Sequence, residues 1–361
     1  MSLVAQISLI REQPFGERFE LKTDFKIPSG QITAVFGPSG SGKTSLLRCI
    51  AGLEKRATAR IQFREEIWQD HKTFLAPHKR RVGYVFQKQN LFPHLTGQGN
   101  LDFAIKRRSE EINQINRASI ISELDITHLM NKLPHQMSGG EQQQIAIARS
   151  ALSNPQLLLM DEPLSSLDES KKKTLLATIK RLNSSYKIPI VFISHSIHEV
   201  LDIAEHLVVM KEGKIINNHP VVDALTKFSA KNQLWPEIGA VIDGKIAHID
   251  SENGLAQIKF PGGELWIPET KLIIGANIRL SILAKDMSVA LTRQDDSSIL
   301  NKLQAKIIDM RPDLNPAFVQ LHLASKTAKF RALITKKSVT YLELQKKQSV
   351  WLQIKSVALN S

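Results

Sequence analysis

The stretch GPSGSGKT, residues 37–44, fits the pattern G-x-x-x-x-G-K-[ST] of a phosphate-binding loop. The short apolar run QITAVF precedes it, and TSLLRCIAGL follows it with helical spacing. The loop therefore stands between a predicted strand and a predicted helix, which is the context that this motif requires. Further strands alternate with helices along the chain, so the sequence predicts an α/β fold with a mostly parallel sheet.

The residues of this loop have the chemistry of a nucleotide site. Glycines let backbone N–H groups turn inward around an anion, and a helix N-terminus adds partial positive charge. Lys43 is expected to reach the β- and γ-phosphates, and Thr44 to offer its hydroxyl to Mg²⁺. A chance Gly/Ser-rich turn is disfavoured because strand, lysine and threonine are all in place. The residues expected to bind ATP here are Gly37, Pro38, Ser39, Gly40, Ser41, Gly42, Lys43, Thr44 and Ser45.

Two carboxylates end a second apolar run, LLLMDE at residues 157–162. Asp161 at the end of this strand is expected to hold Mg²⁺ through water. Glu162 beside it is expected to polarise the attacking water as a general base. Apolar strands that end in aspartate are common, so the upstream loop is what makes this interpretation specific.

Two more polar residues end predicted strands. His195 closes IPIVFISH, and Gln87 closes RVGYVFQ. A lone histidine at a strand end is more often structural, and Gln87 alone would be a surface residue. Because ligands bind at the carboxyl ends of parallel strands, we expect His195 to contact the γ-phosphate. For the same reason Gln87 is expected to contact Mg²⁺ or the attacking water.

A second glycine-rich helix start, SGGE at residues 138–141, lies far along the chain. Ser138 and Glu141 fit the S-x-x-E capping box, so one interpretation is a helix start and nothing more. The other is a second anion site, formed by the Ser138 hydroxyl and the N–H groups of Gly139 and Gly140. The segment alone favours the first interpretation.

In this order, and with SSLD at residues 165–168, these motifs resemble the ATP-binding subunits of ABC transporters over about residues 1–230. The resemblance implies a P-loop NTPase fold with antiparallel β and helical subdomains, and ATP and Mg²⁺ as cofactors. It implies a homodimer packed head to tail, in which residues 138–141 (the signature segment) of one chain close over ATP held by the other. Asp168 would lie at that interface. Glu141 stands where the family usually has glutamine.

Other residues are assigned less directly by the same resemblance. Phe15 is expected by its position to stack on the adenine, whereas Phe19 is more typical of a core. Residues 88–99 are expected to meet membrane permease subunits, with Leu91 and Phe92 either as exposed anchors or as core residues of the helical subdomain.

The composition bounds the class of protein. The net charge of +13 is spread along the chain without a basic arm, so we expect no nucleic-acid partner. One cysteine excludes an intrachain disulfide. The chain start lacks the basic residues of a signal peptide, and no apolar run approaches the roughly 20 residues of a membrane span. We expect a soluble chain held peripherally at the cytoplasmic face of the plasma (inner) membrane.

After about residue 231 short alternating strands dominate. We therefore predict an ATP-binding domain at 1–232, a linker and β extension at 233–296, and a small all-β domain at 297–361. The tetrapeptide SVAL occurs at 288–291 and again at 356–359. Two such matches can be chance, but each closes an alternating strand, which favours a duplicated β half.

The C-terminal segments VWLQIKSVAL, ILAKDMSVAL and SSILNKLQAKI resemble the OB-like molybdate-pterin-binding (Mop) domain of molybdate importers. The resemblance implies the ATP-hydrolysing subunit of such an importer, working with permease subunits and a periplasmic or lipoprotein substrate-binding protein. It also implies molybdate at the C-terminal domain, with Ser298, Asn301 and Lys302 as candidate oxyanion ligands. Leu300 stands where arginine is frequent, so a structural dimerisation module is the alternative.

Two alternatives for the whole chain stay open at this stage. An importer for sulfate, tungstate, ferric iron or a sugar would keep the same ATPase and change the cargo. A soluble ABC ATPase acting on DNA or ribosomes is disfavoured, because the chain has one phosphate-binding loop and no sustained heptads.

Overall fold

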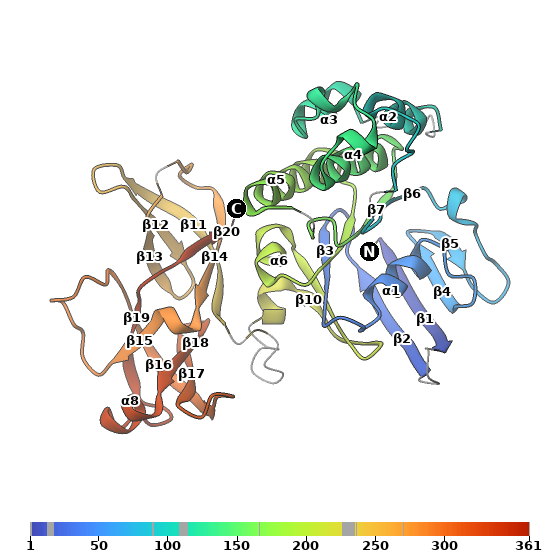
Figure 1. Cartoon of the computed structure of the whole chain (residues 1–361). Coiled ribbons are helices and arrows are strands. Elements are labelled where there is room, and N and C mark those ends of the chain that lie inside the picture. Colours follow the sequence, from blue (N-terminus) through green and yellow to red (C-terminus); the bar gives the residue numbers. More distant parts are fainter. Residues whose placement is uncertain are drawn as a thin grey trace. The chain divides into compact units, whose positions relative to one another are not determined.

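The computed structural model describes residues 2–12, 18–88, 90–107, 115–165, 167–225, 235, 237–269 and 271–360. The chain divides into two compact units, residues 1–221 and 222–361. The expected boundary at residue 232 falls outside the described residues. Figure 1 shows mixed helices and strands in the first unit and predominantly strands in the second.

The main sheet of the first unit has the strand order β10-β9-β3-β8-β7-β6. Strands β9, β3, β8, β7 and β6 are parallel, and β10 is antiparallel to β9. Every residue of β7 and β8 is buried, as continuous apolar runs predict for strands covered on both faces. The strands are β3 Ile32–Phe36, β6 Val82–Val85, β7 Leu157–Asp161, β8 Ile190–Ser194, β9 His206–Lys211 and β10 Lys214–Pro220.

A second, antiparallel sheet in this unit has the order β2-β1-β4-β5. Its strands are β1 Leu3–Glu12, β2 Arg18–Ile27, β4 Thr58–Phe63 and β5 Glu66–Gln69. Apolar and polar residues alternate in both β1 and β2, and the two strands pair over ten residues of each. The inner face of this sheet shares one core with α1 and with the main sheet.

The helices of the first unit include α1 Lys43–Ile50, α2 Gly97–Ile105, α3 Arg117–Glu123, α4 Gly139–Leu152, α5 Glu169–Tyr186 and α6 Ile197–Ile203. Helices α2 and α3 contact α4 and form the expected helical subdomain (Figure 1). Short 3₁₀ turns lie between α3 and α4 at Thr127–Leu129 and Pro134–Gln136. None of the helices within the described ranges has both the length and the apolar character needed to span a bilayer.

The second unit contains two five-stranded sheets around one core, so the all-β expectation is confirmed. One sheet has the order β13-β12-β11-β14-β20, and the other β15-β19-β16-β17-β18. The strands are β11 Ile238–Asp250, β12 Leu255–Phe260, β13 Gly263–Ile267, β14 Asn277–Leu283, β15 Met287–Ala290, β16 Asn301–Pro312, β17 Phe318–Ser325, β18 Ala328–Thr335, β19 Ser349–Ile354 and β20 Ala358–Asn360, with a short helix α8 Lys336–Tyr341.

The two sheets exchange their last strands. Strand β15 follows β14 in the chain but pairs with β19, whereas β20 follows β19 but pairs with β14. The repeated tetrapeptide SVAL overlaps both exchanged strands. The segment 233–296, expected as a linker and β extension, therefore supplies strands β11 to β15. These strands share one core with the strands of the predicted domain at 297–361.

Candidate functional site

The strand order brings the predicted catalytic segments to one edge of the main sheet. Strands β3, β8, β7 and β6 are successive parallel neighbours, so their carboxyl ends meet there. The phosphate loop follows β3, and Glu162 follows β7. His195 follows β8, and Gln87 lies two residues beyond β6. Ligand sites of open α/β sheets lie at this edge.

The phosphate loop ends at α1, whose N-cap is Gly42 in the left-handed conformation at φ 95°. A side chain at this position would be strained, and its Cβ would lie 2.7 Å from the Phe19 ring. Gly37 is equally constrained, because a Cβ there would lie 2.2 Å from the carbonyl oxygen of Met210 on β9. These glycines let the loop pass close to its neighbours.

Lys43, the first residue of α1, points back into the loop. Its ammonium donates to the carbonyl oxygens of Gly37 at 2.8 Å and Pro38 at 2.9 Å. Burial lowers the pKa of Lys43, against the opposing effect of the nearby Glu162 and Asp161 carboxylates. The hydroxyl of Ser41 is buried without a hydrogen-bond partner among the described residues, so it has a free donor within the loop.

Thr44 and Asp161 meet between the loop and the end of β7. The Thr44 hydroxyl donates to Asp161 Oδ1 at 3.1 Å. Burial raises the pKa of Asp161, and the Thr44 hydrogen bond opposes that rise. Two hard oxygen donors in contact suit Mg²⁺, which takes few protein ligands and keeps phosphate oxygens and water.

Glu162 and Gln87 meet at the same edge. The Gln87 amide donates to Glu162 Oε2 at 3.0 Å. Glu162 has a φ of 48°, a left-handed conformation that is uncommon for glutamate and concentrates at functional sites. The sharp backbone turn after β7 separates this carboxylate from that of Asp161. The sequence therefore places two adjacent carboxylates with different partners, one on Thr44 and one on Gln87.

A cavity of about 460 Å³ lies over the loop and includes Glu162. Its lining also contains Phe19, Arg11 and Glu12 from β1 and β2, together with loop residues through Ser45. Phe19 packs against the core cluster as expected, and it also faces this cavity. Phe15, the predicted adenine contact, lies outside the described residues. His195 is exposed beside the end of β8.

The signature segment begins α4, and its capping box is formed. Ser138 Oγ accepts from the Glu141 N–H at 3.3 Å, and Glu141 Oε2 accepts from the Ser138 N–H at 2.6 Å. Because Ser138 Oγ already accepts a bond, its hydroxyl proton is free to be donated elsewhere. A Cβ on Gly140 would lie 2.6 Å from Leu167 Cδ2, so the segment packs against the stretch that leads to Asp168.

Asp168 has a local role in the chain. Its carboxylate caps α5 by accepting from the Lys171 N–H at 2.9 Å, and this bond lowers the pKa of Asp168. Its side chain is 58% exposed, so the cap leaves it accessible to another molecule.

Only part of the C-terminal candidate set comes together. Lys302 lines a cavity of about 430 Å³ with Lys306 and Lys326. Asn301 lies on the opposite, buried face of β16, where its amide bonds both backbone groups of Trp266, at 2.7 Å and 2.9 Å. Ser298 is exposed before β16. The structure therefore gives Asn301 a clamping role between the two sheets.

Sequence reasoning missed one residue beside the carboxylates. The Tyr84 hydroxyl, on β6, is buried near the Asp161 carboxylate. Burial raises the pKa of Tyr84, and the nearby Asp161 carboxylate raises it further. The neighbouring register of β6 and β7 creates this proximity, and no local sequence pattern announces it.

Comparisons with known proteins agree with this geometry. Residues 21–165 match the ABC transporter family, and residues 297–360 match the TOBE domain family. Two structures of the ATP-binding cassette MJ0796, both dimeric and one bound to ADP and Pi, superpose with TM-scores of 0.53. They are 26% and 27% identical to the chain, and cover 61% of it and 99% of their own length.

Relatives match over nearly the whole chain. The molybdenum import ATP-binding protein ModC of Methylococcus capsulatus is 40% identical over 94% of this chain and 96% of its own length. ModC of Saccharophagus degradans is 41% identical over 94% of both chains. ModC of Pseudomonas syringae is 38% identical over 97% of this chain and 98% of its own length. The chain therefore belongs to the family of molybdenum import ATP-binding proteins, the ATP-hydrolysing subunits of ABC transporters.

Proposed function

We propose that this chain energises the uptake of molybdate through a membrane permease. The assignment of molybdate as the cargo rests on one observation. The match to molybdenum importers extends along both units, and not along the ATPase unit alone. The ATPase unit by itself would suit sulfate, tungstate, ferric iron or sugar import equally well.

In the proposed site, the loop residues 37–45 hold the phosphates of ATP, and Lys43 leaves its carbonyl partners to reach the β- and γ-phosphates. Thr44 and Asp161 would hold Mg²⁺ with Gln87 nearby, and the ion would neutralise phosphate charge. Glu162 takes a proton from the attacking water, and the Gln87 amide orients its carboxylate. His195 donates to the γ-phosphate from the end of β8.

We propose a homodimer in which each nucleotide lies between two chains. The dimeric MJ0796 structures support this arrangement. Ser138 and the N–H groups of Gly139 and Gly140 would contact the γ-phosphate held by the partner, and Asp168 would lie at the interface. ATP then holds the two chains together, and hydrolysis releases them.

The remaining partners follow from the cargo. Permease subunits would carry molybdate through the bilayer, and a periplasmic or lipoprotein binding protein would deliver it. The chain would then sit peripherally at the cytoplasmic face of the inner membrane. The charge distribution gives no reason to add a nucleic-acid partner.

The C-terminal unit is proposed to bind molybdate as a sensor of imported product. The cavity beside Lys302 supports an anion there, because three lysines line it against one carboxylate, Glu264. Ser298 remains a candidate ligand. The engagement of Asn301 with Trp266 argues for Lys302 as the stronger member of the predicted set.

The cargo is tested by uptake into proteoliposomes that contain the chain and its permease, with ATP enclosed. Labelled molybdate should enter only with ATP, and unlabelled tungstate should compete better than sulfate. Equal competition by sulfate would contradict the proposed cargo. Calorimetry of the full chain with molybdate then tests the sensor, and a Lys302→Ala variant should bind more weakly.

A further inference from the structure

The signature segment carries an electrostatic conflict. Glu141 lies in the first turn of α4, where a carboxylate stabilises the helix N-terminus. In the proposed dimer this same helix start must accept a phosphate from the partner, and a carboxylate repels a phosphate. The side chain is only 20% exposed, so solvent screens the repulsion incompletely. A cation beside Glu141 would resolve the conflict.

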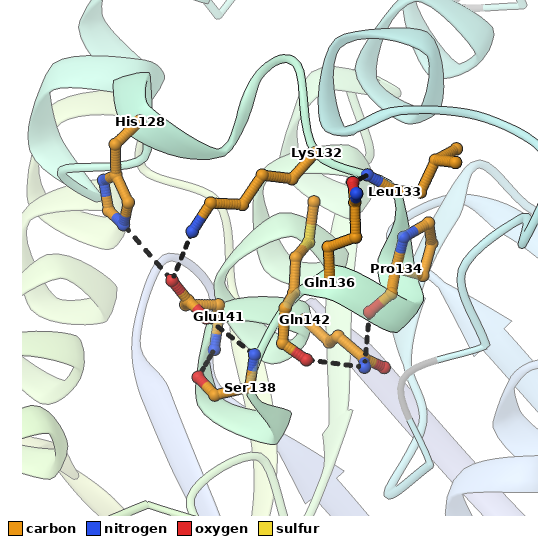
Figure 2. A network of polar contacts seen from close by, with 9 residues as sticks. His128, Lys132, Leu133, Pro134, Gln136, Ser138, Glu141 and Gln142 are labelled. Atoms are coloured by element: carbon orange, nitrogen blue, oxygen red, sulfur yellow. Dashed lines mark hydrogen bonds and ion pairs between the residues drawn. The ribbon is translucent and has the colours of Figure 1, made fainter.

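Two basic side chains provide that resolution. Lys132 Nζ and His128 Nε2 each lie 3.4 Å from Glu141 Oε1, while Oε2 is held by the Ser138 N–H (Figure 2). The Ser138 backbone N–H and, more weakly, Lys132 lower the pKa of Glu141 to about 2, so the carboxylate is ionised at neutral pH. Lys132 contributes an ammonium group, whereas His128 forms an ion pair only when it is protonated.

The backbone of Lys132 has a second attachment. Its carbonyl oxygen accepts from the Gly97 N–H at 2.9 Å, and the Met130 carbonyl accepts from the Gln98 N–H at 2.9 Å. These bonds hold the start of α2, the helix that begins inside the segment 88–99. Gly97 fits tightly, because a Cβ there would lie 2.4 Å from the Leu129 carbonyl oxygen. One residue therefore contacts both the start of α2 and the signature segment.

We infer that Lys132 is a positioning residue for ATP-driven dimerisation, which neutralises Glu141 and fixes Ser138 for the partner's phosphate. The inference rests on the proposed dimer. Lys132 does not itself touch the nucleotide in this account. It acts through the carboxylate, which distinguishes it from a lysine that merely adds positive charge.

The test measures ATP-dependent dimerisation of the full chain by analytical ultracentrifugation, in a Glu162→Gln background that slows hydrolysis. Adding Lys132→Met should raise the ATP concentration needed for half-dimerisation about tenfold, the loss expected for a contact between charged groups. Lys132→Arg should stay within about twofold of the parent, because it keeps a cation at the same place. Lys106→Met, which removes an exposed lysine of the same subdomain, controls for net charge.

The decisive comparison repeats Lys132→Met in a Glu141→Gln background. With no carboxylate to neutralise, the lysine should matter by less than about twofold. An equal loss in both backgrounds, or no loss in either, would overturn the inference. A parent chain that fails to dimerise with ATP would instead overturn the proposed dimer, and the inference with it. The Lys132 side chain is 40% exposed, so thermal unfolding should show intact folds throughout.

Discussion

The two glycine-led helix starts of the first unit are built differently. Within the described residues of the phosphate loop, α1 has no side-chain cap and no acidic residue in its first turn. Helix α4 has a complete capping box and an acidic residue, Glu141, in its first turn. The start of α1 therefore leaves its backbone N–H groups open to a ligand. At the start of α4, the capping box already supplies acceptors to some of the backbone N–H groups.

This difference indicates how one chain can offer two anion sites, one for its own nucleotide and one for the nucleotide held by a partner. The open start of α1 is suited to hold ATP in the single chain. The capped start of α4 is stable without a ligand, and its remaining hydrogen-bond donors are available to a phosphate held by a partner chain.

The largest effect, on ATP hydrolysis, is expected at the carboxyl ends of the main-sheet strands, beside the phosphate loop. Glu162→Gln should slow ATP hydrolysis by about 10²–10⁴-fold while ATP binding remains, because the proposed general base is lost and the phosphate loop is intact. Hydrolysis by the permease complex and binding of a fluorescent ATP analogue measure the two quantities. Glu169→Gln, a side chain 84% exposed on α5, is the matched control. Loss of ATP binding in Glu162→Gln would contradict the proposed role of Glu162 as a general base.

Alanine substitutions of two glycines should separate the two starts. Gly42→Ala strains the left-handed N-cap of α1 and should weaken ATP binding by the single chain about tenfold, a cost of roughly 1–2 kcal/mol. Gly140→Ala should leave that binding unchanged and weaken ATP-driven dimerisation instead, because its Cβ meets Leu167. Titration of ATP at low protein concentration and sedimentation at high concentration check the two halves. If Gly42→Ala and Gly140→Ala weakened ATP binding by the single chain equally, the proposed difference between the two helix starts would be wrong.

The C-terminal unit should be independent of both starts. Asn301→Ala removes both hydrogen bonds to Trp266 and should lower the free energy of unfolding of this unit by about 1–3 kcal/mol. ATP binding should not change. Urea unfolding followed by tryptophan fluorescence reports the first quantity, and ATP titration the second. If Asn301→Ala lowered the affinity for ATP, ATP binding would depend on the C-terminal unit, contrary to this prediction.

The smallest effect concerns the acid limit of stability. The pKa of Glu141 is depressed from the usual 4.5 to about 2, so the ionised side chain stabilises the fold above the unfolded-state pKa. That contribution should be lost as pH falls from about 4.5 to about 2. The difference in unfolding free energy between the native chain and Glu141→Gln should therefore shrink across this window. A difference that stays constant down to pH 2 in urea titrations would contradict the depressed pKa.

Local motifs predict most residues of the candidate ATP site from sequence. The phosphate loop, Asp161 and Glu162 are each fixed by the residues directly around them, and the order of parallel strands then joins them. The contacts of Phe19 with the loop and of Tyr84 beside Asp161 depend on which strands become neighbours. No local pattern contains that information.

The C-terminal unit shows the same limit more strongly. The alternating strands and the repeated SVAL were visible, and they predicted a duplicated β half. The exchange of β15 and β20 between sheets requires pairing across roughly 70 residues, which sequence periodicity does not encode. Asn301 was predicted as a ligand from its motif position, whereas its amide is bonded to Trp266 in the facing sheet.

Mixing two inactive chains tests whether the second helix start serves the nucleotide of another chain. Lys43→Met disables the phosphate loop. Ser138→Asp keeps a good N-cap but repels phosphate at the signature segment. In a mixed head-to-tail dimer, both defects fall on one nucleotide and the other site is intact. Mixing should restore about a quarter of native hydrolysis, since half of randomly paired dimers hold one intact site. No recovery on mixing, with mixed dimers verified by differential tags, would show that both starts serve their own chain's nucleotide and would contradict the account.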